Sequence, residues 1–272
     1  MIEAFGKSIK ALLKNPLVLV PALVLSIVSL FLSDLVSWPL AEAFIEFLLD
    51  LRGFEFGLIE GIVLFASTYS GLLGAVLLLF FVSMTLTALA FIFYSKYAMH
   101  AGEKSALTDA LAFALAKTPR AMALVLSAML IALIAGTLFF VLFLILPMSE
   151  ISILFLILLC LAEFFALFKM FLYACPAIAL DDLNAKEALK KSWNFSFGKM
   201  IPSILAIIIV LFVASIVMQI AFIVLELIDI EILALLIAAF FNSIIFAFAS
   251  FFFAFYFFDH QQDIQRTKRK KK

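Results

Sequence analysis

The segment from Ile201 to Leu225 reads IPSILAIIIVLFVASIVMQIAFIVL and contains no charged side chain. A helix needs about 20 apolar residues to cross the hydrocarbon core of a bilayer, so this segment is long enough to do so. Five more segments of the same character flank it. The six predicted spans are 17–37, 72–94, 121–146, 151–172, 201–225 and 232–258. The sequence therefore predicts an all-α integral membrane helical bundle, with one membrane domain over residues 1–258 and a basic tail over 259–272.

The composition agrees with a membrane location. Of the 272 residues, 67% are hydrophobic and 14% are charged, whereas soluble domains average about 25% charged residues. The formal net charge is zero, which argues against a generally basic nucleic-acid-binding protein. Cys160 and Cys175 lie in one apolar stretch, too far apart along a helix to bridge each other, so we expect buried thiols. His100 and His260 lack partners at metal-ligand spacing, and His260 is expected in a solvated tail, so we expect no metal and no cofactor.

Lysine and arginine predict the orientation of the spans. With six spans, four basic segments fall on one side of the membrane, and Arg52 alone falls on the other. Because basic residues accumulate in cytoplasmic loops, we expect both termini in the cytoplasm and the protein in the cell membrane. The opposite side is acidic, and Glu42, Glu46 and Asp50 share one face of a predicted amphipathic helix. Downstream of it, Gly53, Gly57 and Gly61 would either form a close-packing face or break the chain between this helix and the second span.

A short motif recurs three times on the predicted cytoplasmic side. An acidic residue, an alanine and an apolar residue open a short amphipathic segment, which ends before a proline near the start of a span. The three copies are Glu3-Ala4-Phe5 before Pro16, Asp109-Ala110-Leu111 before Pro119, and Glu187-Ala188-Leu189 before Pro202. We interpret the pattern as a threefold repeat of one interfacial helix followed by one helical hairpin.

The third copy carries most of the interfacial candidates. Asn184 is expected to cap the helix, with Glu187 at the capping-box position. Glu187 is also expected to pair with Lys191 one turn later. The helix is either an element that packs at the lipid interface or a site for lipid head groups or a partner protein. Its candidate contact residues are Lys186, Glu187, Lys190, Lys191 and Trp193.

A family resemblance is found at this same place. The run PAIALDD at 176–182, followed by AKEALKKSW at 185–193, resembles the cytoplasmic loop of the membrane domain of glycerophosphoryl diester phosphodiesterases. Related prokaryotic six-span membrane families of unknown function are similar as well. In the phosphodiesterases a separate soluble barrel carries catalysis, and this sequence offers no segment long enough for one. The resemblance therefore implies a membrane module without the hydrolase, and it transfers no catalytic residue.

Ionisable and polar residues inside predicted spans are the other candidates, because they are costly in lipid. They are Glu163, Lys169, Asn242 and Gln219. Such residues either line a path for protons or solutes or form interhelical hydrogen bonds that fix packing. The polybasic end is expected to anchor the tail or to attract anionic lipid head groups. It comprises Arg266, Lys268, Arg269, Lys270, Lys271 and Lys272.

Motifs for enzyme chemistry are not evident. The sequence contains neither a phosphate-binding Gly-x-x-x-x-Gly-Lys-Ser/Thr loop nor a Gly-x-Ser-x-Gly nucleophile elbow. We therefore expect a non-catalytic membrane module that anchors or scaffolds, with the bilayer, anionic head groups, and a membrane protein or a second copy as partners, and with no nucleic acid. The alternative is a small-solute permease or channel subunit that uses the midplane polar residues.

Overall fold

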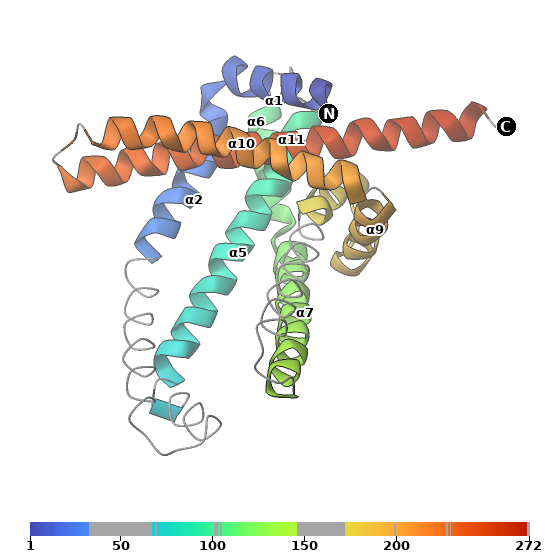
Figure 1. Ribbon diagram of the computed structural model, residues 1–272. Coiled ribbons are helices and arrows are strands. Elements are labelled where there is room, and N and C mark those ends of the chain that lie inside the picture. The colour runs from blue at the N-terminus through green and yellow to red at the C-terminus, as the bar shows by residue number, and fades with distance from the viewer. Residues whose placement is uncertain are drawn as a thin grey trace.

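The computed structural model describes residues 1–32, 67–68, 70–100, 103, 105–145, 172–198, 200–226, 228 and 230–270. Over these residues the protein is helical and contains no strand (Figure 1). The prediction of an all-α protein is confirmed. The elements are α1 (Ile2–Lys14), the 3-10 turn η1 (Pro16–Val18), α2 (Leu19–Leu32), α5 (Ser70–Met99), α6 (Ala106–Ala116), α7 (Thr118–Ile145), a helix over Leu172–Asp181, α9 (Ala185–Gly198), α10 (Met200–Leu225) and α11 (Glu231–Lys270).

Four of the described helices are long and apolar enough to cross a membrane. The qualifying segments are Leu77–Met99, Thr118–Leu138, Ile201–Leu225 and Ile232–His260. These correspond to the second, third, fifth and sixth predicted spans. The fourth predicted span, except for its last residue, lies outside the described residues. So does the whole outer segment with Glu42, Glu46, Asp50, Gly53, Gly57 and Gly61. The long apolar helices support a multi-pass membrane protein.

The first predicted span joins α1 through a sharp corner. Ile2–Lys14 and Pro16–Leu30 meet at an angle of 102°. The corner arises at Asn15, whose backbone is extended (φ −145°, ψ 94°), and Pro16 then starts η1 because it has no N–H to leave unpaired. The side-chain oxygen of Asn15 accepts a hydrogen bond from the N–H of Leu17 at 3.2 Å. This sequence-encoded corner sets α1 across the direction of α2.

The long helices do not all run alongside one another. In Figure 1, α2, α5 and α7 descend from the same end of the molecule, whereas α10 and α11 form a hairpin that lies across them. Helix α11 packs against α2, α1, α10 and α5, so the hairpin crosses at the centre of the molecule. The hairpin therefore contacts both the N-terminal helices and α5.

The core lies where α11 crosses α2 and α5, and aromatic rings fill it. Tyr94 of α5 contacts Phe251 of α11 edge to face, with ring centroids 5.0 Å apart. The hydroxyl of Tyr94 donates a buried hydrogen bond of 2.8 Å to the carbonyl of Val18. Because lipid is as apolar as these side chains, close packing and such hydrogen bonds hold the helices together inside a membrane.

The three short helices each bury a stripe of small residues. The alanine of each recurring motif, Ala4, Ala110 or Ala188, is at most 1% exposed. Small side chains allow a close approach of helix backbones, which lets α1 pack on α11 and α6 pack on α5. The complete stripes are Ala4, Ser8 and Ala11 in α1; Ala106, Ala110 and Ala114 in α6; and Ala185, Ala188 and Ser192 in α9.

Candidate functional site

The start of α9 is fixed by its own side chains. The side-chain oxygen of Asn184 accepts a hydrogen bond from the N–H of Glu187 at 2.9 Å. In return, the N–H of Asn184 donates to the Glu187 carboxylate at 3.4 Å. This reciprocal pair confirms the predicted capping box. The free N–H groups at this helix end are therefore partly satisfied within the chain.

Asp182, two residues before this cap, binds the start of α7. Its φ of 53° lies in the left-handed region, which Asp adopts more readily than most residues. Arg120 donates from Nη1 to the Asp182 carboxylate at 2.5 Å and to the Asp182 carbonyl at 2.7 Å. Lys117 forms an ion pair with the same carboxylate. The hydrogen bonds from Lys117 and Arg120 hold the pKa of Asp182 below its ordinary value.

The neighbouring acid, Asp181, binds α9. Lys191 contacts the Asp181 carboxylate at 2.5 Å, so Lys191 pairs there rather than with Glu187 as predicted. Asp181 and Asp182 thus tie the loop before α9 to α9 itself and to the α6–α7 corner. Asp182 and Arg120 are 62 positions apart in the sequence, and the sequence analysis missed their contact.

Phenylalanine rings lie beside the charged cluster that Asp181, Asp182, Lys117, Arg120 and Lys191 form. Lys96 and Lys117 lie 4.8 and 5.0 Å from the ring centroid of Phe113, and Lys191 lies 5.8 Å from that of Phe257. Cations over aromatic faces are stabilised by the ring quadrupole. Every acid in the cluster is matched by a cation, so the cluster is suited to fastening helices together rather than to general acid–base chemistry.

The predicted contact residues of α9 are placed as follows. Lys186, Glu187 and Lys190 are exposed, Lys191 is half-buried, and Trp193 is 44% exposed. Ala185, Ala188, Leu189 and Ser192 form the buried face. The helix is therefore amphipathic, as predicted, and Trp193 lies on its exposed part.

The predicted intramembrane polar residues are not brought together among the described residues. Glu163 and Lys169 lie outside them, as does Cys160. Asn242 is half-buried on α11, and Gln219 is exposed on α10. Cys175 is buried and free. In the described part of the chain, no group of three His, Cys, Asp or Glu residues is placed to hold a metal ion.

Helix α11 continues beyond residue 258, the predicted end of the sixth span, and it still contacts other helices beyond that point. The helix continues to Lys270, and the backbone carrying Arg266, Lys268, Arg269 and Lys270 is part of it, while Lys271 and Lys272 lie outside the described residues. The ring of His260 lies 5.3 Å from that of Phe195, rather than in a solvated tail. Asp259 binds Lys7 of α1 at 2.7 Å.

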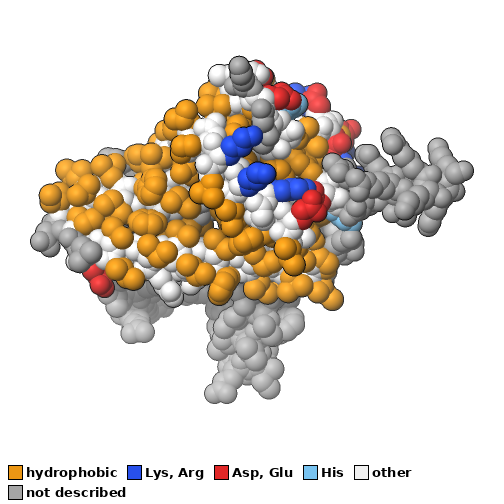
Figure 2. Space-filling view, turned by 90° about the horizontal axis from the view of Figure 1, so that it is seen from above, with side chains coloured by type: hydrophobic (Ala, Val, Ile, Leu, Met, Phe, Trp, Pro, Cys, Tyr) orange, Lys and Arg blue, Asp and Glu red, His pale blue; other side chains and the backbone are white. Residues whose placement is uncertain are grey.

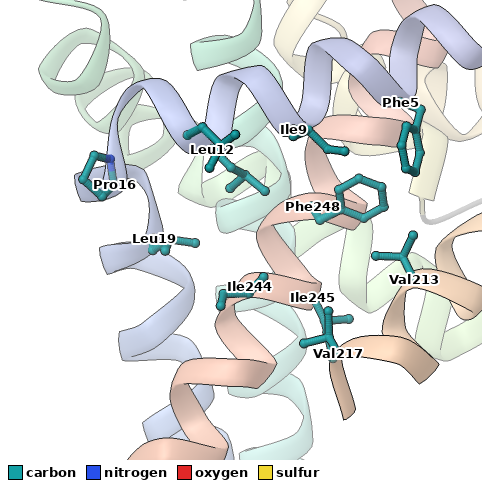
Figure 3. A pocket seen from close by; sticks show the side chains of 11 residues that line it. Phe5, Ile9, Leu12, Pro16, Leu19, Val213, Val217, Ile244, Ile245 and Phe248 are labelled. Carbon is teal, nitrogen blue, oxygen red and sulfur yellow. The ribbon is translucent and has the colours of Figure 1, made fainter. Parts of the chain in front are cut away.

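An apolar pocket of about 390 Å³ lies beside α1, between it and helices α2, α10 and α11 (Figure 3). This volume is within the usual range of ligand sites. Sequence reasoning missed the pocket, because its wall combines residues from both ends of the chain. The lining residues are Phe5, Ile9, Leu12, Leu13, Pro16, Leu19, Val213, Val217, Ile244, Ile245 and Phe248.

The surface around this region is basic at its centre and apolar around it. In Figure 2, Lys and Arg side chains gather in the middle of the face, and hydrophobic side chains cover much of the area around them. Exposed apolar residues on α10 include Leu211, Phe212, Phe222 and Ile223. Such an apolar surface beside cations is typical of a protein surface that contacts both lipid tails and head groups.

Comparisons with known proteins give no relative. No family model, no curated protein and no solved structure matches the chain. The function must therefore be inferred from the residues and their arrangement.

Proposed function

We propose that the protein is a non-catalytic multi-pass membrane module whose short amphipathic helices bind anionic lipid head groups at the cytoplasmic interface. The observation that carries the proposal is the same in α1 and α9. Each helix buries its small-residue stripe and leaves two lysines exposed, Lys10 and Lys14 in α1, and Lys186 and Lys190 in α9. An apolar or packed side combined with a basic wet side is the pattern of helices that lie in a membrane interface.

Electrostatics supports this role. Basic residues near an anionic membrane surface contribute about 1 kcal/mol each to binding. Four of the six basic residues from Arg266 to Lys272 lie in the last turns of α11, and the basic run as a whole would add to this attraction. The proposed partners are therefore the bilayer and its anionic head groups, with a membrane protein or a second copy of the chain as further partners.

The proposed architecture has six spans built from three repeats, with both termini in the cytoplasm. Each short helix is followed by an apolar helix: α1, through η1, by α2, α6 by α7, and α9 by α10. Helix α6 packs on α5, the last helix of the preceding unit, and α1 packs on α11, the last helix of the chain. These two contacts support a repeat of equivalent units, whereas α9 contacts α7 and α10 among the described elements.

Fusions to green fluorescent protein and alkaline phosphatase test the topology. Fluorescence from fusions at both termini, together with phosphatase activity from fusions near residues 50, 148 and 228, is the expected result. Phosphatase activity at residue 104 or 183 would contradict the six-span arrangement.

Lipid binding is tested with the purified full-length protein. The variant K10Q/K14Q/K186Q/K190Q should lose the preference for phosphatidylglycerol over phosphatidylcholine in binding titrations, because the exposed charge is removed. The variant with arginine at the same four positions is the matched control and should keep the preference. Equal preference in the glutamine variant and the wild type would overturn the proposal.

Solute transport is the competing function. It predicts flux through the protein in sealed vesicles, and loss of that flux in Glu163→Gln or Asn242→Ala variants that insert normally. Flux that depends on these residues would show that the protein is a permease and not a non-catalytic module.

A further inference from the structure

We propose that the pocket beside α1 holds one acyl chain of an anionic phospholipid, whose phosphate lies at Lys10 and Lys14. This inference rests on the proposed function and names a particular lipid site within it. All eleven lining residues are apolar, so their side chains offer no hydrogen-bonding partner to a polar ligand (Figure 3). An empty apolar space of this size loses dispersion contacts around its wall, and a hydrocarbon chain restores them.

The pocket is accessible from the side where lipid would lie. Ile9 and Leu13, on its α1 wall, are 38% and 79% exposed. The neighbouring residues Leu17 and Val20 are exposed large hydrophobics as well. The pocket therefore continues into an apolar strip of surface, and a chain can enter from the hydrocarbon without crossing a polar barrier.

The position of the cations selects the head group. Lys10 and Lys14 directly follow the wall residues Ile9 and Leu13, so they lie about 100° further around the same helix. Both lysines are exposed. Their long aliphatic stems can follow the apolar surface while their ammonium groups reach a phosphate at the interface. Lys7, by contrast, is bound to Asp259 at 2.7 Å and to Glu3 at 2.9 Å.

The arrangement thus separates two functions along α1. The face with Phe5, Ile9 and Leu12 contacts the hydrocarbon chain. The face with Lys10 and Lys14 contacts the head group. Because the far wall comes from α10 and α11, the bound lipid would join the first helix of the chain to the last hairpin.

Native mass spectrometry of the detergent-solubilised full chain tests the site, with dioleoyl phosphatidylglycerol and dioleoyl phosphatidylcholine as probes. Val217→Phe fills the pocket from α10 and should lose one tightly bound phosphatidylglycerol, with affinity at that site weakened at least fivefold. Ile216→Phe adds a similar ring at the neighbouring exposed position and is the matched control. The variant K10Q/K14Q should keep one bound lipid but lose its preference for phosphatidylglycerol.

A second measurement uses the unmodified protein. Phosphatidylglycerol with a photoactivatable group in its acyl chain should label Leu12, Val217 or Ile245, and excess unlabelled phosphatidylglycerol should suppress this labelling. Labelling of Leu133, exposed on α7, should resist such competition. Labelling of the pocket no stronger than that of Leu133, or identical lipid binding by Val217→Phe and Ile216→Phe, would overturn the pocket site while leaving head-group binding intact. If the wild type showed no preference for phosphatidylglycerol over phosphatidylcholine, the proposed function itself would be overturned.

Discussion

Two fully buried tyrosines show how much a single hydroxyl depends on its surroundings. Tyr94 donates to the carbonyl of Val18 at 2.8 Å, between α5 and the start of the first apolar segment. The hydroxyl of Tyr173 lies near that of Ser203, but their geometry does not make a hydrogen bond. A satisfied buried hydroxyl stabilises a fold, whereas an unsatisfied one costs free energy.

Replacing each tyrosine by phenylalanine should separate these two cases. Tyr94→Phe should lower the free energy of unfolding by about 0.5–1.5 kcal/mol, because the carbonyl of Val18 loses its partner. Tyr173→Phe, the matched control in a similarly buried ring cluster, should leave it unchanged or slightly raise it. Denaturant titration in mixed micelles measures both. Equal losses in the two variants would contradict the assigned hydrogen bonding.

The acid Asp182 should make stability depend on pH. Its pKa is lowered by hydrogen bonds with Lys117 and Arg120, so its contribution is complete above the unfolded value of about 3.9 and is lost as the pH falls through the folded pKa. Asp182→Asn should therefore melt at a lower temperature than the wild type at pH 7, and the gap should narrow as the pH falls below about 4. Asparagine also tolerates a positive φ, so the backbone is preserved.

Thermal melting between pH 3 and pH 8 measures this gap. Glu226→Gln is the control, because Glu226 is exposed and has no ion pair among the described residues. Its melting temperature should follow that of the wild type throughout the range. A gap for Asp182→Asn that persists unchanged at pH 3 would exclude the carboxylate as its source.

At the scale of elements, the sequence predicts those features that depend only on residues close together in the chain. The capping box of α9 and the helix start at Pro16 follow from residues close together in the chain. The partner of Lys191 does not, because Asp181 and Glu187 are both acids within reach and only the path of the loop decides between them. The same holds for His260, whose contact with Phe195 depends on where α9 ends relative to α11.

The stripe of small residues on α1 makes a specific prediction. Ala4 is fully buried where α1 packs on α11, so Ala4→Leu should overpack this contact and destabilise the protein by about 1–3 kcal/mol. Gly6 has open space around it, and Gly6→Ala should stabilise the helix by up to about 1 kcal/mol. Unfolding in denaturant compares the two variants. Tolerance of leucine at position 4 would show that α1 does not dock closely.

At the scale of the whole molecule, hydropathy predicts spans but not their crossing. Four of the six predicted spans coincide with long apolar helices, because length and composition are local properties. The crossing of the α10–α11 hairpin over α5, and the pocket that it forms with α1, depend on side-chain packing between distant segments. Uniformly apolar helices such as α10 carry no polar stripe that would mark the packed side in the sequence.

The pair Lys7–Asp259 joins the two ends of this assembly. Both side chains are about one-third exposed, so their coupling energy in a double-mutant cycle should be about 0.5–1 kcal/mol. Lys7→Met, Asp259→Asn and the double variant supply the cycle, and unfolding free energies supply the readout. A parallel cycle with Lys10 in place of Lys7 should show no coupling. Zero coupling in the first cycle would remove the ion pair as a link between α1 and α11.

This link has a consequence for biosynthesis. Lys7 and Asp259 are separated by 252 positions. At a synthesis rate of about 5–20 residues per second, the ribosome needs roughly 13–50 s to deliver the partner of Lys7. During that interval the stripe of α1 that docks on α11 is unpaired while the rest of the chain is inserted. Helix α1 of the nascent protein thus stays undocked until α11 has been synthesised, and only then can the assembly of the protein be completed.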